Sequence, residues 1–169
     1  VDTRLPDGPL TGPALVANAD RSFLLHGSCG IPAQATAVSV NLAVVGGTVA
    51  GNLRLHPGGT AIPLVSSINY AAGQIRSNNA VASLSATGEI EAYVGAAFGT
   101  VHFILDVNGY FAPAPPSLSG FSPGLSWVNV GQTSVPTFPI PLTVTLGWAA
   151  VADTFVTVAS SDSGAVVVT

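Results

Sequence analysis

The chain has 169 residues, a length that allows one large hydrophobic core or two small domains. Only 7% of its residues are charged, it contains no lysine, and its formal net charge is -4. Nucleic acids and anionic membrane surfaces are bound by clustered Lys and Arg, so this composition argues against both as partners. A surface with so few ions has little to keep copies of the chain apart, which predicts self-association, a cover of glycans, or both.

The composition also argues against helices and against a membrane span. The chain contains 19 Gly and 13 Pro, which are typical of turns, and many Val and Thr, which suit strands. The most apolar window, residues 37–53, is interrupted by Ser, Asn, Thr and Gly. A spanning helix needs about 20 predominantly apolar residues. We therefore expect an all-β protein with no membrane span.

Short strands separated by turn signals are expected along residues 1–112, which indicates a β-sandwich or a barrel-like domain. The clearest is residues 37–45, where apolar and polar side chains alternate. Gly46 and Gly47 are expected to turn this strand back onto residues 49–56 as a hairpin, with His56 on the outward face. The other expected strands span residues 1–8 with their turn, 21–27, 64–70, 80–84, 89–94 and 101–111.

A change of composition divides the chain at residues 113–117, a Pro/Ala-rich stretch that predicts a linker. Residues 118–169 follow as a second β unit with about half of the seven strands that an immunoglobulin-type sandwich uses. An open strand edge is an aggregation hazard, so we expect a strand of a neighbouring subunit to complete this unit, or else the chain to be truncated. The expected strands are residues 125–130, 142–146, 154–159 and 165–168, and the expected assembly edge comprises Ala165, Val166, Val167 and Val168.

Several separated motifs in the first domain carry a resemblance. They are Val1-Asp2-Thr3-Arg4, Cys29-Gly30-Ile31-Pro32, Asn69-Tyr70-Ala71-Ala72-Gly73-Gln74 with Arg76 and Asn78, and Asp106-Val107-Asn108-Gly109-Tyr110-Phe111. With these motifs the domain resembles a β module of secreted, multi-domain bacterial proteins. The resemblance implies an extracellular β domain without an assigned activity.

The second unit is similar to bacterial surface Ig-like repeats. The stretches that carry this similarity are Val128–Thr133, Leu142–Leu146 and Val156–Asp162. It departs from the repeats because the closing strands are missing. Together the two resemblances imply a location outside the cell, at the bacterial cell surface.

One group of polar residues in the first domain stands out in a chain with so few charges. An isolated buried charge is very costly, so Asp and Arg inside strands are expected to be paired. We therefore predict a structural polar lock between the first strand, the Arg76 loop and the last strand. The alternative, a Ca²⁺ site, is disfavoured because Ca²⁺ takes six to eight oxygen ligands and no Asp-rich loop is present. The predicted lock comprises Asp2, Arg4, Arg76, Asn78, Asp106 and Asn108.

No motif predicts catalysis, a cofactor or a metal site. His26, His56 and His102 fall in different strands without the spacing of metal ligands. Cys29 has no basic neighbour to activate its thiol and is expected to be a small buried residue. Ser160–Gly164 is expected to be a turn rather than part of a serine nucleophile site. Glu89 and Glu91 are expected to share the solvent-facing side of one strand rather than to act as paired catalytic carboxylates.

The sequence therefore favours a structural function over catalysis. We expect a subunit of an extracellular bacterial fibre, filament or surface layer that associates with itself, with glycans as a further expectation. The alternative is a carbohydrate- or protein-binding module of a larger secreted protein, whose sugar-stacking platform would come from aromatic residues. The candidates for that platform are Tyr70, Tyr93, Tyr110, Trp127 and Trp148.

Overall fold

A computed structural model describes residues 1–114, 117–122, 143–147 and 153–157. The chain divides into two compact units, Val1–Pro113 and Ala114–Thr169, and this boundary falls within the predicted linker. The all-β class is confirmed, because the described residues form antiparallel sheets and contain no helix. In this part of the chain there is accordingly no helix that could span a membrane.

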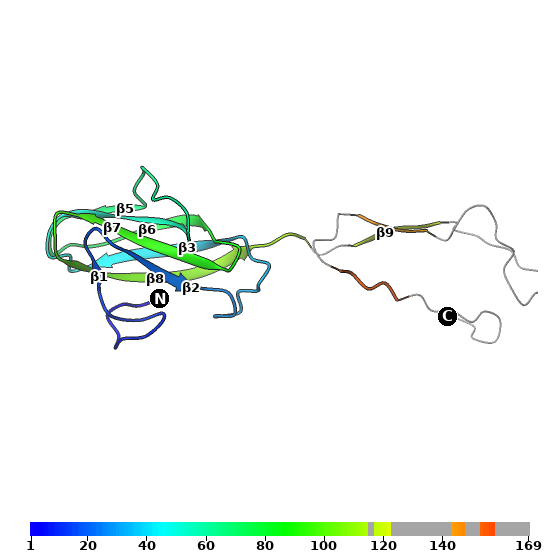
Figure 1. Cartoon of the computed structure of the whole chain (residues 1–169), viewed down its shortest axis with the longest axis horizontal. Coiled ribbons are helices and arrows are strands. Elements are labelled where there is room, and N and C mark those ends of the chain that lie inside the picture. The colour runs from blue at the N-terminus through cyan, green and yellow to red at the C-terminus, as the bar shows by residue number, and fades with distance from the viewer. Residues whose placement is uncertain (115–116, 123–142, 148–152, 158–169) are drawn as a thin grey trace, which may run out of the picture. The chain divides into compact units, whose positions relative to one another are not determined.

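The first unit is a sandwich of two four-stranded antiparallel sheets (Figure 1). One sheet has the strand order β1-β8-β3-β6 and the other has the order β2-β7-β4-β5. Strands that follow one another in the chain therefore alternate between sheets in several places, which gives the jelly-roll arrangement. The strands are β1 (Leu15–Val16), β2 (Asp20–Leu24), β3 (Ala37–Val45), β4 (Gly51–Pro57), β5 (Ile68–Tyr70), β6 (Ile75–Ser83), β7 (Glu89–Ala96) and β8 (Thr100–Phe111).

The core lies between the two sheets and follows from the alternation of apolar residues along the central strands. In β3 every second residue is fully buried, and β7 shows the same alternation with Ile90, Ala92 and Val94 inward. Phe23 and Phe103 meet in the middle of the core, with ring centroids 5.8 Å apart. Each sheet thus has an inner apolar face that forms the core and an outer face that does not contribute to it.

The expected hairpin of residues 37–56 is wrong. The strands β3 and β4 form as predicted, but β3 pairs with β6 and β8, whereas β4 pairs with β5 and β7 in the other sheet. Gly46 and Gly47 start a crossing between sheets rather than a tight turn. Gly47 packs against Tyr70, since a Cβ at this position would lie 2.6 Å from the tyrosine ring.

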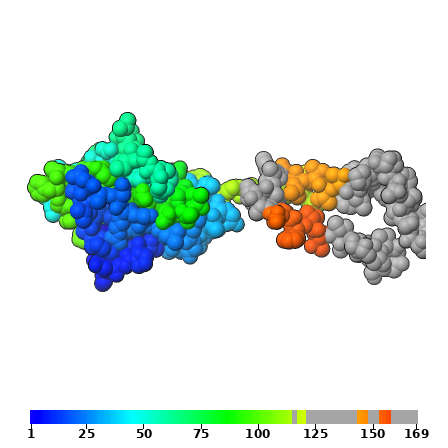
Figure 2. All heavy atoms as spheres, in the orientation of Figure 1, coloured from blue at the N-terminus to red at the C-terminus, as the bar shows by residue number. Residues whose placement is uncertain are grey.

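Two arginines hold irregular segments against the first unit. The guanidinium of Arg21 donates hydrogen bonds to four backbone carbonyls of the segment that precedes β1. Arg54 donates to the carbonyl of Pro63 at 3.0 Å and thereby holds the loop of residues 58–67, which stands out from the body of the unit (Figures 1 and 2). The carbonyl oxygens that accept from Arg21 belong to Gly8, Thr11, Gly12 and Pro13.

In the second unit the structure describes one antiparallel pair, β9 (Leu118–Ser122) and β10 (Thr143–Leu146). The predicted strand at 142–146 matches β10, while β9 was not expected. Residues 153–157 are not assigned to a strand, in contrast to the expected strand at 154–159. The expected strands at 125–130 and 165–168 lie outside the described residues.

Candidate functional site

The six residues of the predicted polar lock do not come together. Asp2 and Arg4 form an ion pair with a 2.7 Å separation between carboxylate and guanidinium. The hydrogen bond with Asp2 is the main cause that raises the pKa of Arg4. Asp106 lies in β8 with its side chain exposed, and its negative charge makes a smaller contribution to the same shift. Asn108 is exposed and lies opposite no residue of β3, at the irregularity where Val107 and Gly109 pair with that strand.

Arg76 and Asn78 lie on β6, on the far side of β3 from β8. They pair with Val44 and Leu42, so their side chains are directed toward the gap between the sheets rather than toward Asp2. Asn78 donates a hydrogen bond to the carbonyl of Ser67 at 2.9 Å and so joins β6 to the loop before β5. The single lock is thus replaced by two separate polar contacts, one at each edge of this sheet.

The residue that fastens the first segment is Thr3, which the sequence reasoning did not select. Its hydroxyl accepts a hydrogen bond from the backbone N–H of Phe103 at 2.7 Å, and its own N–H donates to the Phe103 carbonyl at 2.9 Å. Thr3 is only 1% exposed. The segment therefore continues the edge that β1 forms along β8, and Asp2 forms an isolated bridge with Ile104 beside it.

At the other edge of the same sheet, β6 has one free side. Gly46 donates to the carbonyl of Gln74, and Leu84 donates to the carbonyl of Thr36, so the paired positions next to β6 are even-numbered. Because antiparallel bonding alternates, the odd-numbered residues of β6 direct their N–H and C=O groups away from β3. Among the described residues no backbone group pairs with them. These residues are Ile75, Ser77, Asn79, Val81 and Ser83.

The outer face next to this free side carries no charge along β3 and β6. Asn41 donates a hydrogen bond to the side chain of Asn79 at 3.0 Å, and Ile75 and Val81 are 75% and 66% exposed. Two cavities of about 330 and 270 Å³ also border β6, one beneath the loop of residues 58–67 and one beside Ser67. The outward positions on the two strands are Ala37, Ser39, Asn41, Ala43 and Val45, with Ile75, Ser77, Asn79, Val81 and Ser83.

A second polar cluster lies on the outer face of the other sheet. Asp20 of β2, His56 of β4 and Glu91 of β7 each bring one ligand-type atom within 4.8 Å of the others. His56 was expected to face solvent, but it is only 4% exposed, and its ring contacts Asp20, Glu91 and Thr60. The alternation placed the side chain on the correct face, and the residues that contact its ring there come from two neighbouring strands and from the following loop.

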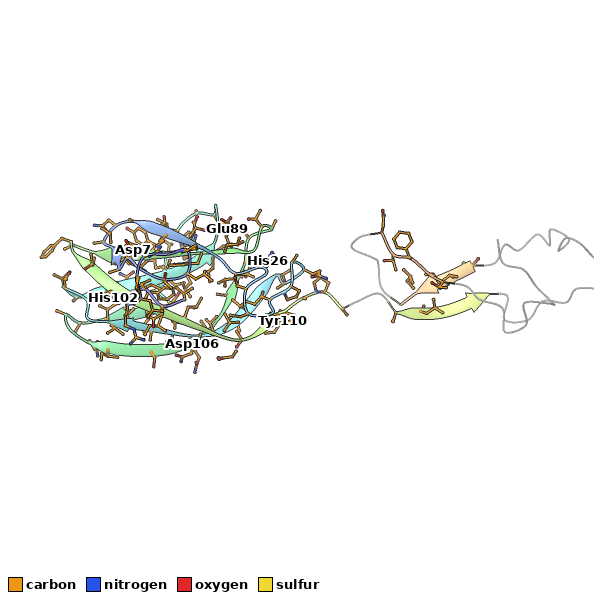
Figure 3. All side chains as sticks on the ribbon, turned by 90° about the horizontal axis from the view of Figure 1, so that it is seen from below. Asp7, His26, Glu89, His102, Asp106 and Tyr110 are labelled. Atoms are coloured by element: carbon orange, nitrogen blue, oxygen red, sulfur yellow. The ribbon has the colours of Figure 1, made fainter. Side chains whose placement is uncertain are left out.

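The remaining candidate residues take structural or exposed positions. His26 contacts the carbonyl of Ala35 at 2.9 Å, and His102 contacts the carbonyl of Thr3 at 3.0 Å. Figure 3 shows Glu89 and Asp106 on opposite sides of the first unit. Cys29 is exposed, which corrects the expectation of a buried thiol, and its φ of 51° places it in a turn.

The aromatic residues do not form one platform in the described part of the chain. Tyr70 is 5% exposed in the core, and its burial raises the pKa of its hydroxyl. The guanidinium of Arg54 lies over the ring of Tyr93, 5.6 Å from its centroid, whereas Tyr110 is half-exposed at the end of β8. Trp127 and Trp148 lie outside the described residues.

Comparison of the chain with models of known protein families found no match, and a search among curated proteins found no similar sequence.

Proposed function

We propose that the chain is a structural protein that assembles with further copies of itself outside the cell, as a subunit of a bacterial surface fibre, filament or layer. The observation that carries this proposal is the free side of β6. This strand has nine residues, contains no proline and carries Arg76 as its single charge. Native proteins usually protect such an edge with several charges, prolines or a paired segment, so an edge with a single charge and no proline favours pairing with another strand.

The occupant that best fits this edge is the same β6 strand of a second copy. An antiparallel pair related by a two-fold axis and centred on Asn79 brings the free N–H and C=O groups of both strands together. In that register Ser77 lies opposite Val81 of the partner subunit, and Arg76 lies opposite Ala82 of the partner subunit. The arginines of the two copies are therefore not placed against each other, and the two sheets continue as one.

The low charge of the chain supports the same interface. No charged side chain occupies the outer face along β3 and β6, so two copies approach without like-charge repulsion. The exposed side chains of Ile75 and Val81 flank the edge, and pairing of the edge removes part of their apolar surface from water. A two-fold contact alone closes a dimer, and a fibre needs a second contact. The predicted edge at Ala165–Val168 remains the candidate for that contact.

The proposal is tested by the sedimentation behaviour of the full chain and of two variants at one position. Asn79→Pro removes an N–H that faces away from β3, so it blocks edge pairing while the native bonds to β3 remain. Asn79→Thr keeps this N–H and is the matched control, because both variants lose the side-chain hydrogen bond from Asn41. We expect the chain and Asn79→Thr to form dimers or larger species and Asn79→Pro to be monomeric. Equal, monomeric sedimentation of all three would refute the proposal.

A further inference from the structure

The hydrogen-bond partners of His56 define the protonation of its ring. Its Nδ1 lies 3.2 Å from the carbonyl oxygen of Pro57 and 3.3 Å from the hydroxyl oxygen of Thr60. The Thr60 hydroxyl already donates its hydrogen to the Pro57 carbonyl at 2.7 Å, so toward the histidine it is an acceptor. Glu91 adds a carboxylate oxygen at 3.6 Å. The carbonyl and carboxylate oxygens beside Nδ1 are acceptors, so the geometry favours the tautomer with the proton on Nδ1.

The other ring nitrogen then faces an acceptor with a lone pair of its own. His56 Nε2 lies 3.1 Å from the carboxylate oxygen Oδ1 of Asp20. Two acceptors at this distance repel each other unless a cation lies at Nε2, and that cation is either a second proton or a metal ion. Metal-binding histidines commonly donate their other N–H to a backbone carbonyl, which is the arrangement that Pro57 provides here.

The charges around His56 favour a divalent cation over a proton alone. Asp20 and Glu91 supply two negative charges, and among the described residues their ion-pair contacts are with His56. The nearby guanidinium of Arg54 is engaged with Asn52 and the carbonyl of Pro63 instead. A divalent ion beside a neutral imidazole balances the charges of both carboxylates without a second proton on the ring.

The spacing of the ligand atoms also suits zinc. Two ligands at about 2.0–2.1 Å from a tetrahedral Zn²⁺ lie about 3.3 Å apart. The separation of His56 Nε2 and Asp20 Oδ1 is 3.1 Å, and one ligand atom from each of the three residues lies within 4.8 Å of the others. The Glu91 side chain is 22% exposed, so it has room to rotate toward the ion.

We propose that Asp20, His56 and Glu91 form a Zn²⁺ site on the outer face of the β2-β7-β4-β5 sheet. His56 binds through Nε2, each carboxylate supplies one oxygen, and a water molecule completes the tetrahedron. The three ligands come from three adjacent strands, and the loop of residues 58–67 supports His56 through Thr60. The site does not depend on the proposed assembly through β6, because β6 belongs to the other sheet.

The test is calorimetric titration of the full chain with zinc chloride in a Cys29→Ser background, which removes the exposed thiol as a competing ligand. We expect one zinc ion per chain. Asp20→Asn and Glu91→Gln each keep the size of the side chain and should weaken binding at least about ten-fold, since even residues that only orient a metal ligand change affinity by about 10–100-fold. Glu89→Gln is the matched control on the same strand and should leave binding unchanged.

Nuclear magnetic resonance of the histidine rings provides the second readout, and it does not depend on the variants folding. Zinc should shift the Nε2 resonance of His56 and leave those of His26 and His102 unchanged. The absence of zinc uptake at millimolar concentration would overturn the proposal and leave a second proton as the cation at Nε2. Uptake that shifts His26 or His102 instead, or that is equal in Asp20→Asn, Glu91→Gln and Glu89→Gln, would overturn it as well.

Discussion

Thr3 and Phe103 exchange two hydrogen bonds at the edge of the β1-β8-β3-β6 sheet. The Thr3 hydroxyl accepts from the Phe103 N–H at 2.7 Å, and the Thr3 N–H donates to the Phe103 carbonyl at 2.9 Å. Both residues are excluded from water, with exposed fractions of 1% and 0%. The first residues of the chain are thereby part of the sandwich. Among the described residues, the Thr3 hydroxyl is the protein group that accepts a hydrogen bond from the buried N–H of Phe103.

We expect Thr3→Val to destabilise the first unit by about 1–3 kcal/mol, because it keeps the volume of the side chain but leaves the buried Phe103 N–H without an acceptor. Urea denaturation followed by circular dichroism measures the change. Thr36→Val is the matched control, since the exposed Thr36 hydroxyl contacts the carbonyl of Phe111 at 3.3 Å. Equal effects of the two substitutions would show that the buried contact has no special weight.

The ion pair between Asp2 and Arg4 predicts that the stability of the first unit depends on pH in the acidic range. Hydrogen bonds from the side chain and backbone of Arg4 lower the pKa of Asp2 from 3.8 to about 2. A carboxylate with a lowered pKa contributes stability that is present above pH 3.8 and is lost as the pH falls toward 2. Because the pair is exposed, the contribution to the free energy of unfolding is small.

The direct measurement is a titration of the Asp2 carboxyl carbon by nuclear magnetic resonance. We expect a midpoint near 2 in the native chain and a return toward 3.8 in Arg4→Gln. Arg76→Gln is the control, because Arg76 lies on β6 at the opposite edge of the sheet. An unchanged midpoint in Arg4→Gln would contradict the assignment of the shift to this pair.

Gly88 combines two structural requirements in the turn before β7. Its φ is +84°, and an added Cβ would lie 1.9 Å from the ring of His26. Gly73 has a similar φ of +69° but open space around the Cβ position. Both Gly→Ala substitutions incur the strain of a left-handed residue, which is about 1–2 kcal/mol. We therefore expect Gly88→Ala to lower the melting temperature clearly more than Gly73→Ala, and equal losses would exclude the ring contact as a cause.

The faces of the strands could be predicted from the sequence, and their partners could not. Alternation in residues 37–45 assigned the inner side chains of β3 correctly, because burial of one face imposes a period of two. Alternation does not say which strand lies alongside, so the Gly46-Gly47 pair was interpreted as a hairpin when β4 in fact belongs to the other sheet. Long-range pairing decides the topology, and no local signal encodes it.

For the polar residues as well, the sequence could not predict which side chains meet in the fold. The low charge predicted that Asp2 and Arg4 would be paired, and they are, but Arg76 was joined to them without knowledge of the strand order. The cluster around His56 was missed because Asp20, His56 and Glu91 are far apart in the chain and meet only through the pairing of β2, β7 and β4. His56 and Glu91 were on the outward side of predicted strands, and Asp20 immediately preceded the predicted strand at 21–27. The register that brings the three together was not predictable from these positions.

Assembly through β6 is tested most directly by amide hydrogen exchange along this strand in the full chain at two concentrations. If β6 pairs with a second copy, the amides of Ser77, Asn79 and Val81 are protected at high concentration as strongly as those of the even-numbered residues. They should lose this protection on dilution and in Asn79→Pro, while the even-numbered amides bonded to β3 stay protected. Rapid exchange of the odd-numbered amides at every concentration would contradict it.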